Sequence, residues 1–159
     1  MNSYGVRQSL APRPDGSVSY AQIFAMQPFG NGLVVQTFTG AQIKQLLEQQ
    51  FASGANTAEA PNMLLPSAGF AFAYDLSRPA GDRVVKMTLN GKRLDPNATY
   101  RVTTNSFLSS GGDNFTVLTE GKDAFDAGSD LDATEAWLQS GAKSKLGGRI
   151  TDLTPKPAM

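Results

Sequence analysis

Residues 33–51 read LVVQTFTGAQIKQLLEQQF, a stretch in which a strand pattern passes directly into a helix pattern. The first six residues are mostly β-branched or aromatic, which is typical of a β-strand. Thr39 and Gln42 have the spacing of a capping box, which satisfies free backbone N–H groups at the start of a helix. The apolar residues that follow recur at helical spacing: Ile43, Leu46, Leu47 and Phe51. The stretch therefore predicts a strand followed by an amphipathic helix over 39–51.

Outward from this stretch, short strand and helix patterns alternate with turns, without a regular strand–helix–strand repeat. A short helix is expected at 20–26, with Ser19 as its N-cap and Pro28 ending it. Asn90-Gly91 joins two apolar runs and is a strong signal for a two-residue hairpin turn. We expect strands at 33–38, 70–74, 83–89, 92–94, 100–104 and 147–150, and a polar loop at 121–130. These elements favour an α/β fold of the α+β kind, with helices packed on a mixed sheet.

A second capping pattern, Asp132 with Glu135, predicts a helix that runs through Trp137 and Leu138 and stops near Gly141. Trp137 is interpreted as a core residue because of its helical spacing with Leu138. Five phenylalanines on regular elements are interpreted in the same way: Phe24, Phe38, Phe51, Phe70 and Phe72. The length predicts one domain over 1–153, with 154–159 as a flexible tail.

The amino-acid composition limits the kinds of chemistry that this chain can perform. The chain has 159 residues with no cysteine and no histidine, and 14 basic side chains balance 14 acidic ones. Disulfides, thiolate or imidazole metal ligands and a Ser-His-Asp triad are therefore excluded. The zero net charge argues against a general nucleic-acid binder. The sequence contains no run of 18 apolar residues, which a membrane-spanning helix would need, and no signal peptide is visible. Binding is favoured over catalysis.

Three loops carry the remaining signal: NSYGVR at 2–7, QPFGN at 27–31 and NSFLSSGGDNF at 105–115. In this order and spacing they resemble the C-terminal domain of the 5'-nucleotidase family. That family includes bacterial periplasmic nucleotidases, UDP-sugar hydrolases, 2',3'-cyclic-nucleotide phosphodiesterases and animal ecto-5'-nucleotidase. The resemblance continues through 39–44, 66–84 and 89–102 and covers roughly 2–150. Each motif alone is weak, whereas their ordered combination is specific.

The resemblance implies a substrate-binding domain without its catalytic partner. In the family, an N-terminal metallophosphoesterase domain holds two divalent metal ions and hydrolyses the phosphate ester. This chain has no histidine for that centre and begins near the family's domain border. It is therefore expected to hold no cofactor or metal and to be inactive alone, as part of a phosphoric ester hydrolase. Its partners would be a nucleoside or nucleotide and the N-terminal domain, and its location periplasmic, cell-surface or secreted.

The resemblance also implies roles for single residues. Phe29 and Phe107 occupy the family's two stacking positions, where a purine base would lie between two aromatic rings. Asn31 can offer a donor and an acceptor to a base edge. The remaining candidates face the sugar and the phosphate: Asp113 for the ribose hydroxyls, Gly111 and Gly112 for close approach of the backbone, and Arg7 with Asn2 for the phosphate.

Other interpretations stand beside these. Phenylalanine is usually a core residue, GGDN is usually a tight turn, and Arg7 could be a surface residue. Asp123, Asp126, Asp130 and Asp132 could form a calcium loop, although a solvated acidic loop is favoured. The family usually has glycine where Tyr4 and Asn114 stand here, which weakens the first motif most. The alternative function is a stand-alone, non-catalytic nucleoside-binding or surface-interaction module.

Overall fold

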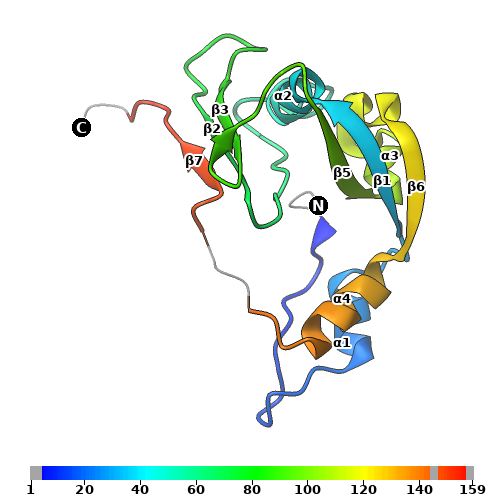
Figure 1. The fold of residues 1–159 in the computed structure, drawn as a ribbon. Helices are drawn as coiled ribbons and strands as arrows, with labels where there is room; N and C mark the ends of the chain where they lie inside the picture. The colour runs from blue at the N-terminus through cyan, green and yellow to red at the C-terminus, as the bar shows by residue number, and fades with distance from the viewer. Residues whose placement is uncertain (1–4, 144–146, 157–159) are drawn as a thin grey trace.

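The structure, a computed structural model, describes residues 5–143 and 147–156 and contains two sheets rather than one (Figure 1). The first sheet is antiparallel with strand order β5-β1-β6, formed by Thr99–Asn105, Gly32–Thr39 and Lys122–Ser129. The second has the order β4-β3-β2-β7, formed by Lys92–Arg93, Val84–Leu89, Phe70–Tyr74 and Ile150–Asp152. Its β2–β7 pair is parallel, and this makes the second sheet mixed.

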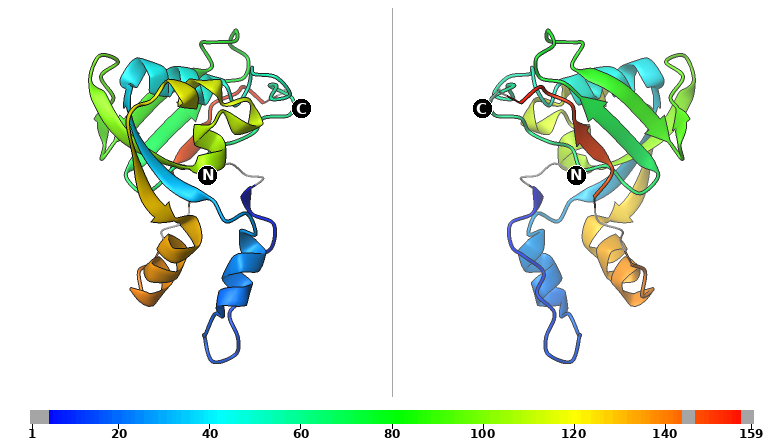
Figure 2. Two further views of the ribbon diagram at one scale, coloured as in Figure 1. Left: turned by 90° about the vertical axis from the view of Figure 1, so that its right-hand side faces the viewer. Right: turned by 90° about the vertical axis from the view of Figure 1, so that its left-hand side faces the viewer.

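The helices take different places around the sheets. Helix α2 (Gly40–Glu48) lies between them, whereas α1 (Tyr20–Met26) and α4 (Asp130–Gln139) project below them (Figures 1 and 2). Three short turns of helix connect β5 to β6: α3 (Ser106–Ser109), η2 (Gly112–Asn114) and η3 (Thr116–Glu120). The fold class expected from the sequence, helices packed on β-sheet, is confirmed.

Capping accounts for where α1 and α2 begin. The Thr39 hydroxyl accepts a hydrogen bond from the Gln42 N–H, and the Gln42 side chain accepts one from the Thr39 N–H. Ser19 and Gln22 form the same reciprocal pair at α1. Each box satisfies N–H groups that have no partner inside the helix, and both helices begin where the sequence predicts.

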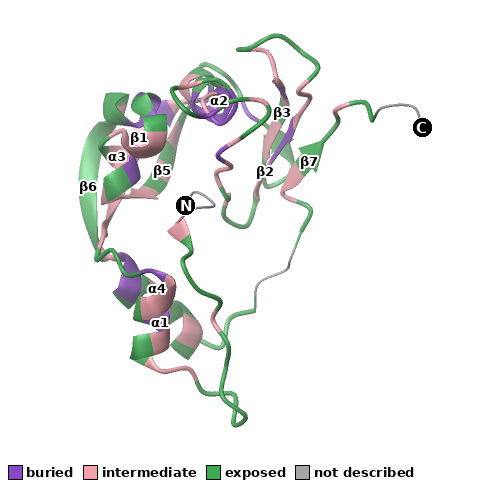
Figure 3. Ribbon diagram, turned by 180° about the vertical axis from the view of Figure 1, so that it is seen from behind, coloured by how far each residue is buried: buried purple, intermediate pink, exposed green. Residues whose placement is uncertain are grey.

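The core lies between α2 and the two sheets (Figure 3). Helix α2 contributes the predicted apolar face, and the 106–120 segment contributes four fully buried residues. The buried cluster consists of Phe38, Ile43, Leu46, Leu47, Phe51, Phe72, Val84, Leu94, Leu108, Phe115, Val117 and Leu118. Leu108 and Phe115 are both buried in this core, and residues 109–114 form the short surface segment between them.

The Asn90-Gly91 turn is confirmed. Asn90 and Gly91 have φ values of 50° and 78°, the left-handed conformation that a two-residue hairpin of this kind requires. Leu89 pairs with Lys92 across the turn. The predicted hairpin therefore has its expected register.

Two predictions for residues 121–135 are wrong. Residues 122–129 form the edge strand β6, where Val35 of β1 faces Phe125, instead of a polar loop. Seven of its eight residues are exposed, so pairing with β1 holds it without any apolar pattern. Helix α4 begins at Asp130 and not at Asp132, because the Ser129 hydroxyl accepts hydrogen bonds from Leu131 and Asp132 N–H. Its expected end before Gly141 is confirmed.

Two expected core aromatics are exposed. Phe24 is 47% exposed and Trp137 is 45% exposed, because α1 and α4 stand clear of the sheets and bury only a narrow face (Figure 3). Phe38, Phe51 and Phe72 are buried as predicted, and Phe70 packs on the core while half-buried. The last strand runs over 150–152, later than the expected 147–150.

Within the described ranges, no helix is both long and apolar enough to cross a membrane. The proposed boundary of the domain at residue 153 stays a prediction, and residues 157–159 lie outside the described part. Leu153 N–H donates a 2.8 Å hydrogen bond to the Tyr74 carbonyl of β2, and the Thr154 hydroxyl accepts one from Leu76 N–H just after that strand.

Candidate functional site

A cavity of about 540 Å³ lies where three segments distant in the sequence meet. Its lining combines two aromatic rings with cationic, anionic and amide side chains. The lining residues are Gly5, Arg7, Phe29, Asn31, Asn105, Phe107 and Asp113. All three loops singled out in the sequence contribute to it, and this convergence makes it the candidate site.

The first two segments are held together at the end of α1. Arg7 N–H donates a hydrogen bond of 2.9 Å to the Met26 carbonyl, which sets the N-terminal segment beside the turn that follows α1. Gly30 has a φ of 60°, a conformation that glycine adopts without a steric penalty. This turn places Phe29 and Asn31 on the same cavity.

The two phenylalanines present their rings to solvent. Phe29 is 45% exposed and Phe107 is 48% exposed, although Leu108, next to Phe107, is fully buried. The Arg7 guanidinium lies 5.1 Å from the centre of the Phe29 ring, within the range of a cation–π interaction. Exposed rings that line a polar cavity have apolar faces available for a flat ligand.

Gly112 lies directly against the Phe107 ring. A Cβ atom at position 112 would lie 2.6 Å from Cε1 and Cζ of Phe107 and 2.7 Å from its carbonyl oxygen. No side chain fits in that space, so the ring rests directly on the glycine backbone. Gly112 thus acts on the cavity through Phe107, and neither it nor Gly111 lines the cavity.

The loop that carries Asp113 has a strained backbone. Asp113 and Asn114 have φ values of 54° and 64°, a left-handed conformation that favours glycine and that aspartate and asparagine adopt more readily than other residues. This explains why asparagine can stand where the family usually has glycine. The Asn56 side chain donates a 2.9 Å hydrogen bond to the Asp113 carbonyl, and the Ser53 hydroxyl donates one of 2.7 Å to the Asn114 carbonyl. The 52–66 loop therefore supports the site.

Asn31 is held by its surroundings. The Ser106 hydroxyl donates to Asn31 Oδ1 at 3.4 Å and accepts from Gly32 N–H at 3.2 Å. The Asp130 N–H donates a hydrogen bond of 3.0 Å to the Asn31 carbonyl, which attaches the start of α4 to this residue. Burial raises the pKa of Asp130, and a hydrogen bond from the Leu131 N–H partly offsets that rise.

Two residues that line the cavity, Asn105 and Gly5, were not among the candidates from the sequence. One candidate, Asn2, lies outside the described residues. Asn105 lines the cavity and caps α3, its Oδ1 accepting from Leu108 N–H at 2.9 Å. Its signal was an asparagine at a strand end, three residues before a buried leucine. Gly5 also lines the cavity; it lies in the 2–7 loop singled out in the sequence, but it has no side chain that would mark it as a ligand-binding residue. Asn2 and Tyr4 lie outside the described residues.

Metal ligands are scarce in the part of the chain that the structure describes. It contains no group of three or more acidic, cysteine or histidine side chains placed to hold a metal ion. Asp123 and Asp126 lie on the exposed edge strand β6, whereas Asp130 is buried at the start of α4. The donor set therefore does not fit the two-metal centre that the family resemblance implies for the catalytic domain.

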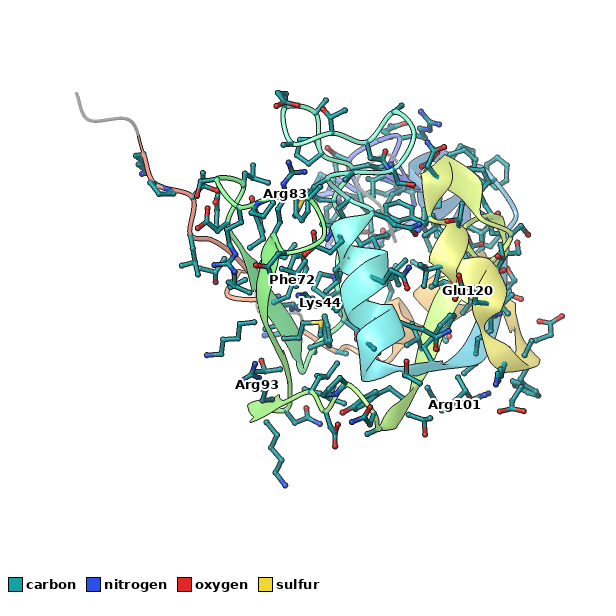
Figure 4. The ribbon with its side chains drawn as sticks, turned by 90° about the horizontal axis from the view of Figure 1, so that it is seen from above. Lys44, Phe72, Arg83, Arg93, Arg101 and Glu120 are labelled. Carbon is teal, nitrogen blue, oxygen red and sulfur yellow. The ribbon has the colours of Figure 1, made fainter. Side chains whose placement is uncertain are left out.

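A larger groove of about 610 Å³ lies elsewhere, between α2 and the hairpin of β3 and β4. Lys44 and Arg93 lie on it (Figure 4), together with apolar residues such as Met87 and Leu94. Lys44 forms an ion pair of 3.3 Å with Asp82. None of the three loops contributes to this groove, and it lacks aromatic side chains.

The sequence is similar to that of known proteins over most of its length. Residues 1–120 match the family "5'-nucleotidase, C-terminal domain". The trifunctional nucleotide phosphoesterase protein YfkN of Bacillus subtilis is 31% identical over 94% of this chain and 10% of its own length. Protein UshA of Yersinia enterocolitica is 33% identical over 72% of this chain and 19% of its own length.

A solved structure agrees with these sequence matches. A 5'-nucleotidase precursor from Thermus thermophilus superposes with a TM-score of 0.78 and is 37% identical, covering 96% of this chain and 30% of that one. The chain thus spans only about a tenth to a third of the length of these relatives.

Proposed function

The chain belongs to the 5'-nucleotidase family as its C-terminal domain, and from this we propose that it is the nucleoside-binding part of a metal-dependent nucleotide phosphohydrolase. In this role it holds the base and the ribose so that the phosphate reaches a metal centre in another domain. The chain by itself hydrolyses nothing. The names of its relatives, a nucleotide phosphoesterase and 5'-nucleotidases, support a hydrolase of phosphoric esters as the parent.

One observation carries the proposal: two half-exposed phenylalanines line a single cavity together with Arg7, Asn31 and Asp113. A nucleotide presents two apolar ring faces, a polar base edge, sugar hydroxyls and a phosphate. The cavity offers one matching group for each.

The roles follow from the chemistry of each group. Phe29 and Phe107 stack on the base, at about 1–3 kcal/mol for each stacked ring. The Asn31 amide forms hydrogen bonds with the base edge, and the Asp113 carboxylate accepts hydrogen bonds from the ribose hydroxyls. Arg7 makes a charge-assisted contact to the phosphate, and Asn2 is assigned to the same end. Gly111 and Gly112 act indirectly, because they shape the turn that carries Asp113 and Gly112 lies against the Phe107 ring.

The catalytic partner in this proposal is an N-terminal metallophosphoesterase domain of the same parent chain. Two divalent ions bound there would supply the nucleophile and stabilise charge at the phosphorus. The described residues of this chain do not fit such a centre. We assign the parent to the periplasm or the cell surface, because a relative of solved structure is named a precursor.

Calorimetric titration of the full chain with adenosine and with AMP tests the proposal. Both ligands are expected to bind, and Phe107→Ala and Phe29→Ala are each expected to raise Kd by roughly 5- to 140-fold, the equivalent of about 1–3 kcal/mol. The matched control is Phe125→Ala, which removes a more exposed ring, at 62%, on β6 and outside the cavity. It is expected to leave Kd within about twofold.

Three results would contradict the proposal. No heat with adenosine, AMP or uridine would argue against a nucleoside site and would favour a surface-interaction module. Equal effects of Phe107→Ala and Phe125→Ala would show that the clamp is misassigned. Release of phosphate from AMP by the purified chain, in the presence of Mn²⁺, would show that the chain is not limited to binding.

A further inference from the structure

Asn56 lies outside the three loops singled out in the sequence, in the 52–66 loop, and it is buried. Only 6% of the residue is exposed, and it does not line the cavity. Its backbone is fixed by a tight turn, since its N–H donates to the Ser53 carbonyl at 2.9 Å and its carbonyl accepts from the Ser53 N–H at 3.1 Å. A buried amide is stable in a fold only when it is hydrogen-bonded, so the partners of the Asn56 side chain indicate its role.

The Asn56 side chain joins two parts of the fold. Its Nδ2 atom donates a 3.1 Å hydrogen bond to the Gln49 carbonyl and a 2.9 Å hydrogen bond to the Asp113 carbonyl. Because both partners are acceptors, the two bonds use both hydrogens of the NH₂ group. Gln49 is the C-cap of α2, where helix carbonyl groups have no partner inside the helix. The amide therefore connects the end of α2 to the loop that carries Asp113.

The backbone that Asn56 holds has an unfavourable conformation. Asp113 has a φ of 54°, which costs free energy for a residue with a side chain and persists where surrounding contacts hold it. The Ser53 hydroxyl holds the next carbonyl, that of Asn114, at 2.7 Å. Two consecutive peptide groups are thus attached to the 52–66 loop. Because the backbone sets the direction of a side chain, these bonds determine how Asp113 enters the cavity.

We propose that Asn56 is a positioning residue for ribose recognition, which holds the Asp113 carbonyl so that the Asp113 carboxylate is directed at the sugar hydroxyls. The inference rests on the proposed nucleoside site. A ligand without 2' and 3' hydroxyls offers the carboxylate no donor, so Asn56 affects the affinity only for ligands that carry these hydroxyls. Holding the loop in advance also removes the cost of ordering it when the ligand binds.

Calorimetric titration with adenosine and with 2',3'-dideoxyadenosine tests this role. Asn56→Ala is expected to raise the Kd of adenosine by roughly fivefold, the equivalent of about one hydrogen bond, and that of dideoxyadenosine by less than about twofold. Asn56→Leu keeps the side-chain volume without the donors and is expected to show the same selective loss. In an Asp113→Gly background, which tolerates the positive φ but lacks the carboxylate, Asn56→Ala is expected to change the Kd of adenosine by less than about twofold.

The matched control is Asn62→Ala, which removes a second buried asparagine of the same loop that does not line the cavity. It is expected to leave both Kd values within about twofold. A ligand-free ¹H–¹⁵N spectrum adds a second readout, because the Asn114 N–H belongs to the same peptide group as the Asp113 carbonyl. Its signal is expected to shift in Asn56→Ala and to stay in place in Asn62→Ala.

The outcomes separate this inference from the proposed function. Equal losses of affinity for the two ligands would show that Asn56 only stabilises the fold, and this would overturn the positioning role. An unmoved Asn114 signal in Asn56→Ala would overturn it as well. If the wild type binds neither ligand while the Asn114 signal shifts, the nucleoside site fails and the contact between Asn56 and the Asp113 loop stands.

Discussion

Replacing Gly112 with alanine is expected to move the Phe107 ring and thereby weaken both folding and binding. The new Cβ would lie 2.6 Å from two ring carbons, whereas ordinary contact begins at 3.4 Å, so the ring must retreat by about 0.8 Å, the difference between these distances. The Phe107 carbonyl oxygen would be 2.7 Å away, and because it is a backbone atom it cannot rotate aside. Overpacking of this kind costs about 1–3 kcal/mol of stability.

The free energy of unfolding in urea and the Kd for adenosine measure the two effects. The affinity should fall by roughly 5- to 140-fold, as for loss of one stacked ring at about 1–3 kcal/mol. Gly32→Ala is the matched control: neither glycine has a positive φ, but a Cβ at 32 meets only the Gly128 carbonyl oxygen at 3.8 Å. If Gly112→Ala is as stable as Gly32→Ala, the steric argument is refuted. If the Kd of Gly112→Ala equals that of the wild type, the link between Gly112 and the site is refuted.

Two further predictions concern the fold. Glu48→Ala removes the oxygen that accepts a 2.6 Å hydrogen bond from the buried Val84 N–H, so unfolding in urea should show a loss of about 1–3 kcal/mol, whereas Glu48→Gln should lose less. Hydrogen bonds from Arg78 and Lys44 lower the pKa of Asp82, so this carboxylate stabilises the fold above the ordinary aspartate pKa of about 4, and the gain is lost as pH falls through the lowered value. The difference in melting temperature between wild type and Asp82→Asn should therefore shrink in acid, and a constant difference from pH 7 to pH 2 would contradict this reasoning.

Local patterns in the sequence predicted most of the helices and strands. They failed where an element depends on a partner that is distant in the sequence. Capping boxes and the Asn90-Gly91 turn involve residues within a few positions of each other, so their energetics can be evaluated from neighbours alone. The edge strand β6 has no such signal, because its backbone is held by β1, about ninety residues earlier. The exposure of Trp137 was mispredicted for a related reason. Helical spacing marks an apolar side chain, but only the position of α4 relative to the sheets determines whether anything covers it.

The sequence by itself determined the chemistry available to this protein. Without histidine or cysteine, and with aromatic, amide, carboxylate and guanidinium groups in three ordered loops, it pointed to ligand binding. The tertiary structure decided which of these groups meet and which face outward. Phe107 is half-exposed and the adjacent Leu108 is fully buried, because α3 turns one toward the cavity and the other into the core. Only packing can make that choice, since the two residues are equally apolar and their burial depends on which surface approaches each of them.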